Sequence, residues 1–256
     1  VGIWLLTTFD PACTNPELSF IQYQGAVPTE ERVITLGVGG GKYDEHRMPG
    51  HLHTSATKLV FQDLFHRGLI PNTDHQVKAL EWLVEFTNAE DNGVGYGQHD
   101  EQRPFHIANI LRSHRNRTGS DADQIRFGLE LISDIMDELN TRATFLQEWD
   151  KRVEFETPWG KGVAVVSDYG RSESFAYAQD FVIRINQHRT EAVSSLKAKP
   201  DSSVDLTAAY EHASVIEPNA WYLHQSKKML ISNDQPGTER VHTKFSLQQL
   251  IDLVKK

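Results

Sequence analysis

The chain has 256 residues, of which 39% are hydrophobic and 24% charged, a balance typical of a globular protein with one large domain or two smaller ones. Its formal net charge of −9 argues against a protein that coats nucleic acid nonspecifically, because such binding depends on neutralising phosphates. Since Cys13 is the only cysteine and no apolar run approaches the roughly 20 residues of a membrane span, we expect a cytoplasmic protein without disulfides or a membrane partner.

The first 41 residues carry short apolar runs separated by turn signals. Residues 1–8 are too short a run for periodicity to distinguish the end of a helix from a strand. Residues 18–23 and 33–38 are predicted strands, and the second of them ends in the glycine cluster 39–41.

Helical spacing begins after this cluster. A first helix is predicted to start after Thr54 or Ser55 and to stop at Gly68. A second helix is expected over residues 73–89, and a short third one after Pro104, a residue that suits the first turn of a helix.

A long amphipathic helix is predicted to begin at Ser120 or Asp121. Its apolar residues recur every three or four positions and so share one stripe; they are Ile125, Leu129, Ile132, Met136, Leu139, Ala143, Leu146 and Trp149. A core-facing helix or a strut between domains explains such a stripe, and a coiled-coil surface of a homodimer is the alternative. Residues 157–160 are predicted to end this helix.

Strands dominate the rest of the chain, with a polar loop through residues 200–203. The predicted strands are residues 162–167, 175–186, 221–224 and 229–231. A terminal helix is predicted after Ser246, which suits an N-cap. We therefore expect an α/β domain over residues 1–120, a connector helix over 121–156 and a smaller α+β domain over 157–256.

The first candidate site is Tyr43-Asp44-Glu45-His46, just beyond a predicted strand and its glycine-rich turn. Ligands of α/β sheets bind beyond the carboxyl ends of strands. Two carboxylates and an imidazole suit Mn²⁺ or Mg²⁺ better than thiolate-held zinc, and His51 and His53 follow closely. A polar surface turn that caps a helix is the alternative.

Asp91 and an arginine cluster are further candidates. Asp91 precedes Asn92-Gly93, a strong turn and C-cap signal, so it is either a turn residue or a carboxylate that completes a metal site. Arg112, Arg115 and Arg117 form a basic cluster in an acidic chain. Guanidinium groups match phosphate oxygens, but cations also stabilise the carboxyl end of a helix.

Residues 221–226 hold a histidine and a hydroxyl at the end of a predicted strand. His224 and Ser226 are candidates for contact with a substrate. A histidine on a strand is also a common core or edge residue, so both interpretations stay open.

Four segments occur together in an order that is known from one superfamily; they are Gly37-Val38-Gly39-Gly40, Tyr43-Asp44-Glu45-His46, Thr54-Ser55-Ala56-Thr57 and Asp91-Asn92-Gly93. They resemble the DHH phosphoesterase superfamily, and most closely its melanocyte-proliferating-gene type exonucleases and their uncharacterised bacterial relatives. These proteins carry Asp-Val-Gly-Gly, Tyr/Phe-Asp-His-His, a Ser-Ala-rich helix and Asp-Asn-Gly. Residues 221–226 resemble the His-x-Ser segment near the end of the same proteins, so the resemblance covers most of the chain.

This resemblance implies a Rossmann-like parallel-sheet domain joined by a helix to a smaller α+β domain. It implies hydrolysis of phosphodiester or phosphoanhydride bonds, usually with two Mn²⁺ ions. By position, Asp44 and His46 match the DHH triplet and are the implied catalytic residues. The implied metal ligands are Asp44, Glu45, His46 and Asp91, and the candidate substrate-binding residues are Arg112, Arg115, Arg117, His224 and Ser226.

The chain departs from this pattern at two motif positions and lacks one motif. Glu45 stands in place of the middle histidine, and Gly37 stands in place of a metal-binding aspartate. The first motif of the superfamily, a strand ending in His-x-Asp-x-Asp, is expected upstream of residue 1, with residues 1–8 as the remainder of the helix that follows it.

We expect a metal-dependent phosphoesterase that uses Mn²⁺ or Mg²⁺. The expected substrate is a phosphate-containing small molecule or a short single-stranded nucleic acid. The alternative is a catalytically degenerate member of the superfamily that binds a nucleotide or a protein partner. Gly37 and the missing first motif motivate that alternative.

Overall fold

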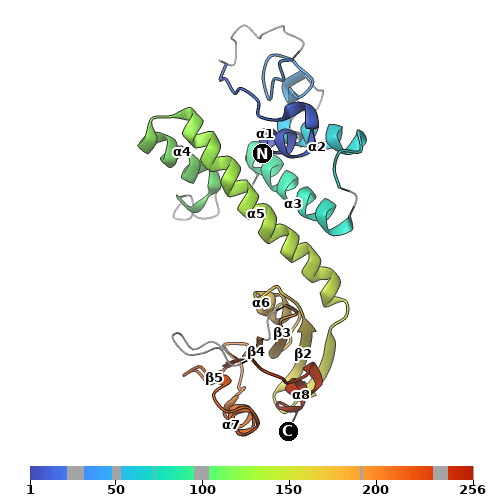
Figure 1. The fold of residues 1–256 in the computed structure, drawn as a ribbon, viewed down its shortest axis with the longest axis vertical. Coiled ribbons are helices and arrows are strands. Elements are labelled where there is room, and N and C mark those ends of the chain that lie inside the picture. Colours follow the sequence, from blue (N-terminus) through green and yellow to red (C-terminus); the bar gives the residue numbers. More distant parts are fainter. Residues whose placement is uncertain are drawn as a thin grey trace. The chain divides into compact units, whose positions relative to one another are not determined.

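The computed structural model describes residues 1–21, 32–47, 53–71, 73–94, 104–190, 193–232 and 242–255 (Figure 1). The chain forms two compact units, a first unit of residues 1–143 and a second unit of residues 144–256. Helices and a six-stranded mixed sheet are both present, which confirms a mixed α/β class. No helix among the described residues has the length and apolar character of a membrane span.

Helices dominate the described part of the first unit. They are α1 (Gly2–Phe9), α2 (Ala56–His66), α3 (Asp74–Asp91), α4 (Ile107–Thr118) and most of α5 (Asp121–Trp149), with the short 3₁₀ helices η1 (Pro11–Cys13) and η2 (Glu45–Arg47). The predicted helices after Ser55, from about residue 73 and after Pro104 are confirmed. Ser55 accepts a hydrogen bond from the Lys58 N–H, as an N-cap does, and Gly119 ends α4 in the left-handed conformation.

Helices α1, α2 and α3 surround one apolar core (Figure 1). Its fully buried members include Leu5, Val60, Leu64, Ala79 and Leu80. The stripe of α5 packs against the same core, and the Trp4 indole donates to the Ser133 hydroxyl at 3.1 Å. The core-facing interpretation of this helix is therefore confirmed for the part that lies in the first unit.

The predicted strand over residues 33–38 is wrong. The described part of the first unit contains only an isolated parallel bridge, between Leu36 and Tyr43. Val33 and Ile34 are exposed, and positive φ angles from Gly37 onward turn the chain away before a ladder can form. Residues 18–21 are likewise not a strand, and the rest of that predicted strand lies outside the described residues. The Rossmann-like arrangement of this region stays a prediction.

The sheet lies in the second unit and has the strand order β1-β2-β3-β4-β6-β5. Its strands are β1 (Val153–Thr157), β2 (Gly160–Val166), β3 (Ile183–Gln187), β4 (Ser194–Ala198), β5 (Trp221–Leu223) and β6 (Met229–Ser232). Strands β2 and β3 are parallel, and the other neighbours are antiparallel. The predicted strands over residues 162–167, 221–224 and 229–231 are confirmed.

Helices cover both faces of this sheet. On one face, α7 (Thr207–Ile216) and α8 (Leu247–Asp252) pack against the side of β2 that carries Ala164. On the other face, Val163 and Val165 contact α6 (Ser172–Tyr177) and the last turns of α5. This alternation explains why β2 is apolar at successive positions. The predicted Ser246 cap of α8 is confirmed, with a complete capping box.

The predicted end of the long helix is wrong, because α5 ends at Trp149 and residues 153–157 form β1. The apolar stripe also stops at Trp149, and beyond it Val153, Phe155 and Thr157 alternate with glutamates in the two-residue period of a strand. Residues 158–159 connect two antiparallel strands. The predicted strand over 175–186 is α6 at its start and β3 at its end, while β4 and α7 were not predicted.

Arg184 of β3 is fully buried inside the second unit. Its guanidinium donates to the Glu173 carboxylate at 2.6 Å, to the Ser195 hydroxyl at 2.8 Å and to the Gly170 carbonyl at 2.9 Å. These contacts join β3 to β4 and to α6. They compensate for the burial of a charge that would otherwise be very costly.

We predict that Glu173→Gln lowers the free energy of unfolding by about 3 kcal/mol, because it leaves the Arg184 charge buried without its anion. Urea unfolding of the whole chain measures this change. The exposed Glu154→Gln on β1 is the control and is expected to change the value by less than about 1 kcal/mol. Equal effects of the two variants would contradict the assignment.

Candidate metal centre

Asp63 of α2 fixes the segment that carries the candidate ligands. Its carboxylate accepts hydrogen bonds from the Tyr43 hydroxyl, at 2.6 Å, and from the Lys42 ammonium. Arg67 donates to Asp63 at 3.3 Å and to Asp10, just beyond α1, at 2.7 Å. Tyr43 and Asp10 are buried. The segment before η2 is thus tied to both α1 and α2, although it has almost no regular structure.

A glycine turn brings the chain back over the candidate ligands. Gly37, Gly39 and Gly40 have φ angles of 67°, 73° and 68°, in the left-handed region that glycine adopts without strain. The Gly37 N–H donates to the Tyr43 carbonyl at 2.9 Å, which closes the turn. The Gly40 N–H then donates to Asp44 Oδ2 at 2.5 Å.

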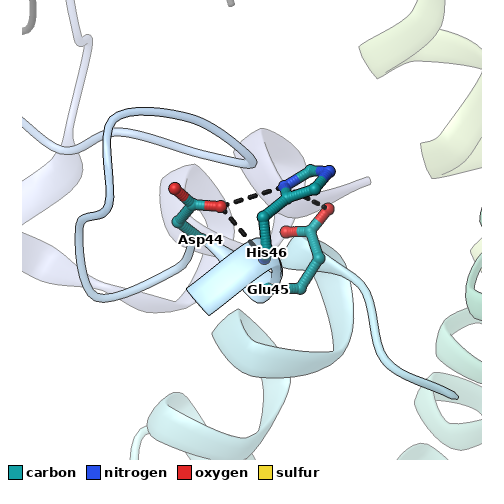
Figure 2. A group of neighbouring side chains, drawn as sticks. All are labelled: Asp44, Glu45 and His46. Carbon is teal, nitrogen blue, oxygen red and sulfur yellow. Dashed lines mark hydrogen bonds and ion pairs between the residues drawn. The ribbon is translucent and has the colours of Figure 1, made fainter. Parts of the chain in front are cut away.

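Asp44, Glu45 and His46 lie together just beyond this turn (Figure 2). One ligand atom from each residue lies within 4.8 Å of the other two. His46 Nδ1 is 3.0 Å from Asp44 Oδ1 and 3.8 Å from Glu45 Oε1. Asp44 and Glu45 are buried, whereas the His46 side chain is exposed. Three donors of the types that hold a hard or borderline cation therefore converge at a point that is open on one side.

Asp44 also has a structural role. Besides the Gly40 N–H, its carboxylate accepts the His46 N–H at 3.1 Å, as a residue that caps a short helix does. Burial raises the pKa of Asp44, but the hydrogen bonds from Gly40 and His46 outweigh that effect and hold the pKa below its ordinary value. The carboxyl group is therefore ionised at neutral pH. Asp44 therefore has the helix-capping role that the sequence offered as an alternative. Its carboxylate nevertheless stays charged beside Glu45 and His46.

The buried carboxylate of Glu45 is not compensated by described hydrogen bonds as that of Asp44 is. Among the described residues, its buried Oε2 has no hydrogen-bond partner. A Cβ atom placed on Gly37 would lie 3.7 Å from Glu45 Oε1 and 3.9 Å from Oε2, so the carboxylate occupies the space that a side chain at position 37 would enter. Burying a carboxylate oxygen without a partner is costly unless a cation or a donor compensates for it.

The residues present fit a divalent cation of the Mn²⁺ or Mg²⁺ type. Both carboxylates offer oxygen ligands, His46 offers an imidazole nitrogen, and the partnerless Glu45 oxygen belongs to the same group. Manganese accepts such a mixed oxygen and nitrogen set more readily than magnesium does. No thiolate is present, since the only cysteine is buried Cys13 and is not part of this group.

Asp91 is not part of this group of ligand atoms. It is the last residue of α3, and it is exposed. Its neighbour Asn92 donates to the Thr54 carbonyl at 3.2 Å and to the Asn88 carbonyl at 2.7 Å, which ties the end of α3 to the start of α2. His53 is exposed, and His51 lies outside the described residues.

The three arginines lie on α4 and are exposed. Arg115 forms an ion pair with Asp121, and Arg117 contacts His114 at 3.2 Å. Arg115 and Arg117 occupy the last turn of the helix, where cations stabilise its negative end. The structure gives these two residues a local structural role and leaves their role in substrate binding a prediction.

His224 and Ser226 lie in the turn between β5 and β6 of the second unit. His224 Nδ1 is 2.8 Å from the Ser226 hydroxyl and accepts the Ser226 N–H at 3.2 Å. The pair stabilises a tight turn in which Lys227 has a positive φ of 58°. A role in substrate binding stays a prediction.

Sequence reasoning missed Asp63 and Arg67, which position the centre without belonging to it. A signal was present, because Asp63 and Arg67 are four residues apart on a predicted helix and so share one face. Their partners Tyr43 and Asp10 are distant in the sequence, and no spacing rule connects them.

Comparisons of this chain with protein-family models, with curated proteins and with solved structures found no match. A proposal on the function of this chain therefore depends on the chemistry of Asp44, Glu45 and His46 and on the resemblance of the short motifs. Of the predicted metal ligands, Asp44, Glu45 and His46 lie together and Asp91 lies outside their group.

We predict that Asp63→Asn lowers the free energy of unfolding by about 1–3 kcal/mol at neutral pH, because the hydrogen bonds of Asp63 to Lys42 and Arg67 are charged. Hydrogen bonding to Arg67 lowers the pKa of Asp10. Burial raises the pKa of Asp63, but its three hydrogen bonds outweigh this effect and hold the pKa below its ordinary value. Both carboxylates therefore bind protons more readily in the unfolded chain than in the folded one, so stability is lost as the pH falls below about 4. This acid loss should be smaller in the variant.

Urea unfolding between pH 7 and pH 3 measures both effects. Asp134→Asn, an exposed position on α5, is the control. A variant at position 63 whose stability and acid sensitivity match those of this control would contradict the positioning role of Asp63.

Proposed function

We propose that this chain is a metal-dependent phosphoesterase that hydrolyses phosphodiester bonds in short single-stranded nucleic acid or in phosphate-containing small molecules. The observation that carries the proposal is the group of Asp44, Glu45 and His46, in which a buried carboxylate oxygen lacks a partner. The motif resemblance to DHH phosphoesterases supports the same chemistry. Asp44, Glu45 and His46 would hold Mn²⁺ or Mg²⁺.

When bound, such an ion supplies Lewis-acid chemistry that neutralises phosphoryl charge and lowers the pKa of water. The residues of the chain supply the geometry. The Gly40 and His46 N–H groups hold Asp44 ionised and fixed. Asp44 in turn orients the His46 ring through the Oδ1–Nδ1 contact of 3.0 Å. Glu45 adds a second buried negative charge that favours a cation over water.

Two observations favour a second candidate function, the binding of a nucleotide or protein partner without catalysis. Asp91 is not part of the ligand group, and Gly37 offers no side chain ligand. A three-residue group suits one ion better than the pair of ions that the resemblance implies. Mn²⁺ binding without hydrolysis of any oligonucleotide, dinucleotide or pyrophosphate would favour this second function.

We predict that Glu45→Gln weakens Mn²⁺ binding by about tenfold or more, because it removes a charged ligand. Calorimetric titration measures the affinity, and hydrolysis of short oligonucleotides should fall in parallel. Without metal, the variant should be at least as stable as the wild type, since it removes a buried charge that has no partner. This separates loss of a ligand from loss of the fold.

Glu130→Gln, at an exposed position of α5, is the matched control. It makes the same chemical change away from the ligand group and should bind Mn²⁺ as the wild type does. The proposal fails if Glu45→Gln and Glu130→Gln bind Mn²⁺ with the same affinity.

We further predict that Gly37→Asp destabilises the metal-free chain and increases the stabilisation that Mn²⁺ provides. In the absence of metal it should lower the melting temperature, because position 37 has a positive φ and the new carboxylate would lie beside that of Glu45. Saturating Mn²⁺ should then raise the melting temperature more in the variant than in the wild type, because an added ligand tightens binding. An equal or smaller rise would contradict a cation at this position.

A further inference from the structure

A cavity of about 360 Å³ lies in the second unit, where the parallel strands β2 and β3 end. Val166 and Gln187 are the last residues of these strands, and Ser194 is the first residue of β4. The cavity is lined by Val166, Gln187, His188, Arg189, Thr190, Val193, Ser194 and Thr243. The carboxyl ends of parallel strands commonly bind ligands. All of its lining residues belong to the second unit, and none of them is a residue of the candidate metal centre.

The walls of the cavity are held in place by hydrogen bonds. Asp168 Oδ1 accepts the N–H groups of Arg189, at 2.8 Å, and of Thr190, at 3.3 Å, and it lies 3.0 Å from His188 Nδ1. The hydroxyl of Thr243, another lining residue, donates to Glu217 at 2.8 Å. The cavity is therefore formed before any ligand binds.

Two groups on the cavity wall can donate hydrogen bonds that the described residues do not use. The Ser194 side chain is 1% exposed, and its hydroxyl has no hydrogen-bond partner in the described part of the chain. The half-exposed Arg189 guanidinium forms an ion pair with Glu148 through its Nη2, and its other N–H groups have no hydrogen-bond partner among the described residues. A buried hydroxyl without a partner on a cavity wall is a group that a ligand can satisfy.

We propose that this cavity binds an oxyanion of the phosphate type, with Arg189 and Ser194 as the donors. The described carboxylates near the cavity are already engaged by donors or cations of the chain. Asp168 already accepts two N–H groups beside His188, Glu148 is paired with Arg189, and Glu217 accepts from the Thr243 hydroxyl and the Lys244 N–H. Guanidinium and hydroxyl donors match phosphate oxygens in charge and geometry.

This site does not depend on the proposed hydrolysis, because it uses no residue of the metal centre. Inorganic phosphate is the probe. It is titrated into the full-length chain in the presence of a chelator, with chloride keeping the ionic strength constant. Calorimetry gives the affinity, and nuclear magnetic resonance shifts of the amides of Gln187, Arg189 and Ser194 give the location.

We expect saturable binding of phosphate, with shifts at these amides. Arg189→Gln and Ser194→Ala should each weaken binding by about tenfold, as expected for loss of a charged or buried donor. Lys161→Gln is the matched control, because it removes one positive charge at the other end of β2 and should change the affinity by less than about twofold.

The absence of saturable phosphate binding in the wild type would overturn the proposal. So would an equal loss of affinity in Lys161→Gln, or unchanged binding in Ser194→Ala when its melting temperature equals that of the wild type. Binding of acetate as tightly as phosphate would also overturn it, since a carboxylate offers fewer oxygens to the two donors. A negative result here leaves Mn²⁺ binding by the metal centre untouched.

Discussion

The Asp63 carboxylate of α2 joins this helix to the segment of Lys42 and Tyr43, and it also accepts a hydrogen bond from Arg67 one turn further along the chain. The segment that carries the candidate ligands has only an isolated bridge and a single 3₁₀ turn, so its shape depends on such side-chain contacts. Arg67 extends the network to Asp10. Lys42 and Arg67 are exposed, but Asp10 is buried and the Asp63 side chain is only 15% exposed, so the two carboxylates interact with these cations more strongly than fully solvated groups would. The position of Asp44, Glu45 and His46 follows from this network and from the positive φ angles of the glycine turn.

Two carboxylates in this segment are buried for different reasons. Asp44 is compensated, because three hydrogen bonds stabilise its charge and one of them caps η2. Glu45 Oε2 is not compensated by any described residue, and it lies where Gly37 has no side chain. The Glu45 carboxylate thus occupies space that is open because residue 37 is a glycine. A bound cation would explain why this oxygen is buried, since it would replace the lost hydration.

Local signals predicted the starts of several helices well, but they missed α6 and α7 and predicted the long-range arrangement poorly. Ser55 and Ser246 gave reliable helix starts because a cap is a contact between near neighbours. Residues 33–38 have strand propensity but turn away at Gly37, and no neighbouring strand is described for them. The grouping of Asp44, Glu45 and His46 followed from their adjacency in the sequence. Tertiary packing is not encoded by spacing within the sequence. It determines that Asp91 lies outside the ligand group, that Tyr43 pairs with Asp63, and that the Ser194 hydroxyl has no partner among the described residues.

We propose that Asp44, Glu45 and His46 together bind a divalent cation. Electron paramagnetic resonance of Mn²⁺ added to the 256-residue chain tests this binding, because the signal distinguishes hydrated from protein-bound ions and pulsed methods detect a coordinated imidazole nitrogen. We expect a bound Mn²⁺ signal with nitrogen coupling that disappears in His46→Gln, while binding weakens in Glu45→Gln. A spectrum of hydrated Mn²⁺ alone, or nitrogen coupling that persists in His46→Gln, would contradict the account.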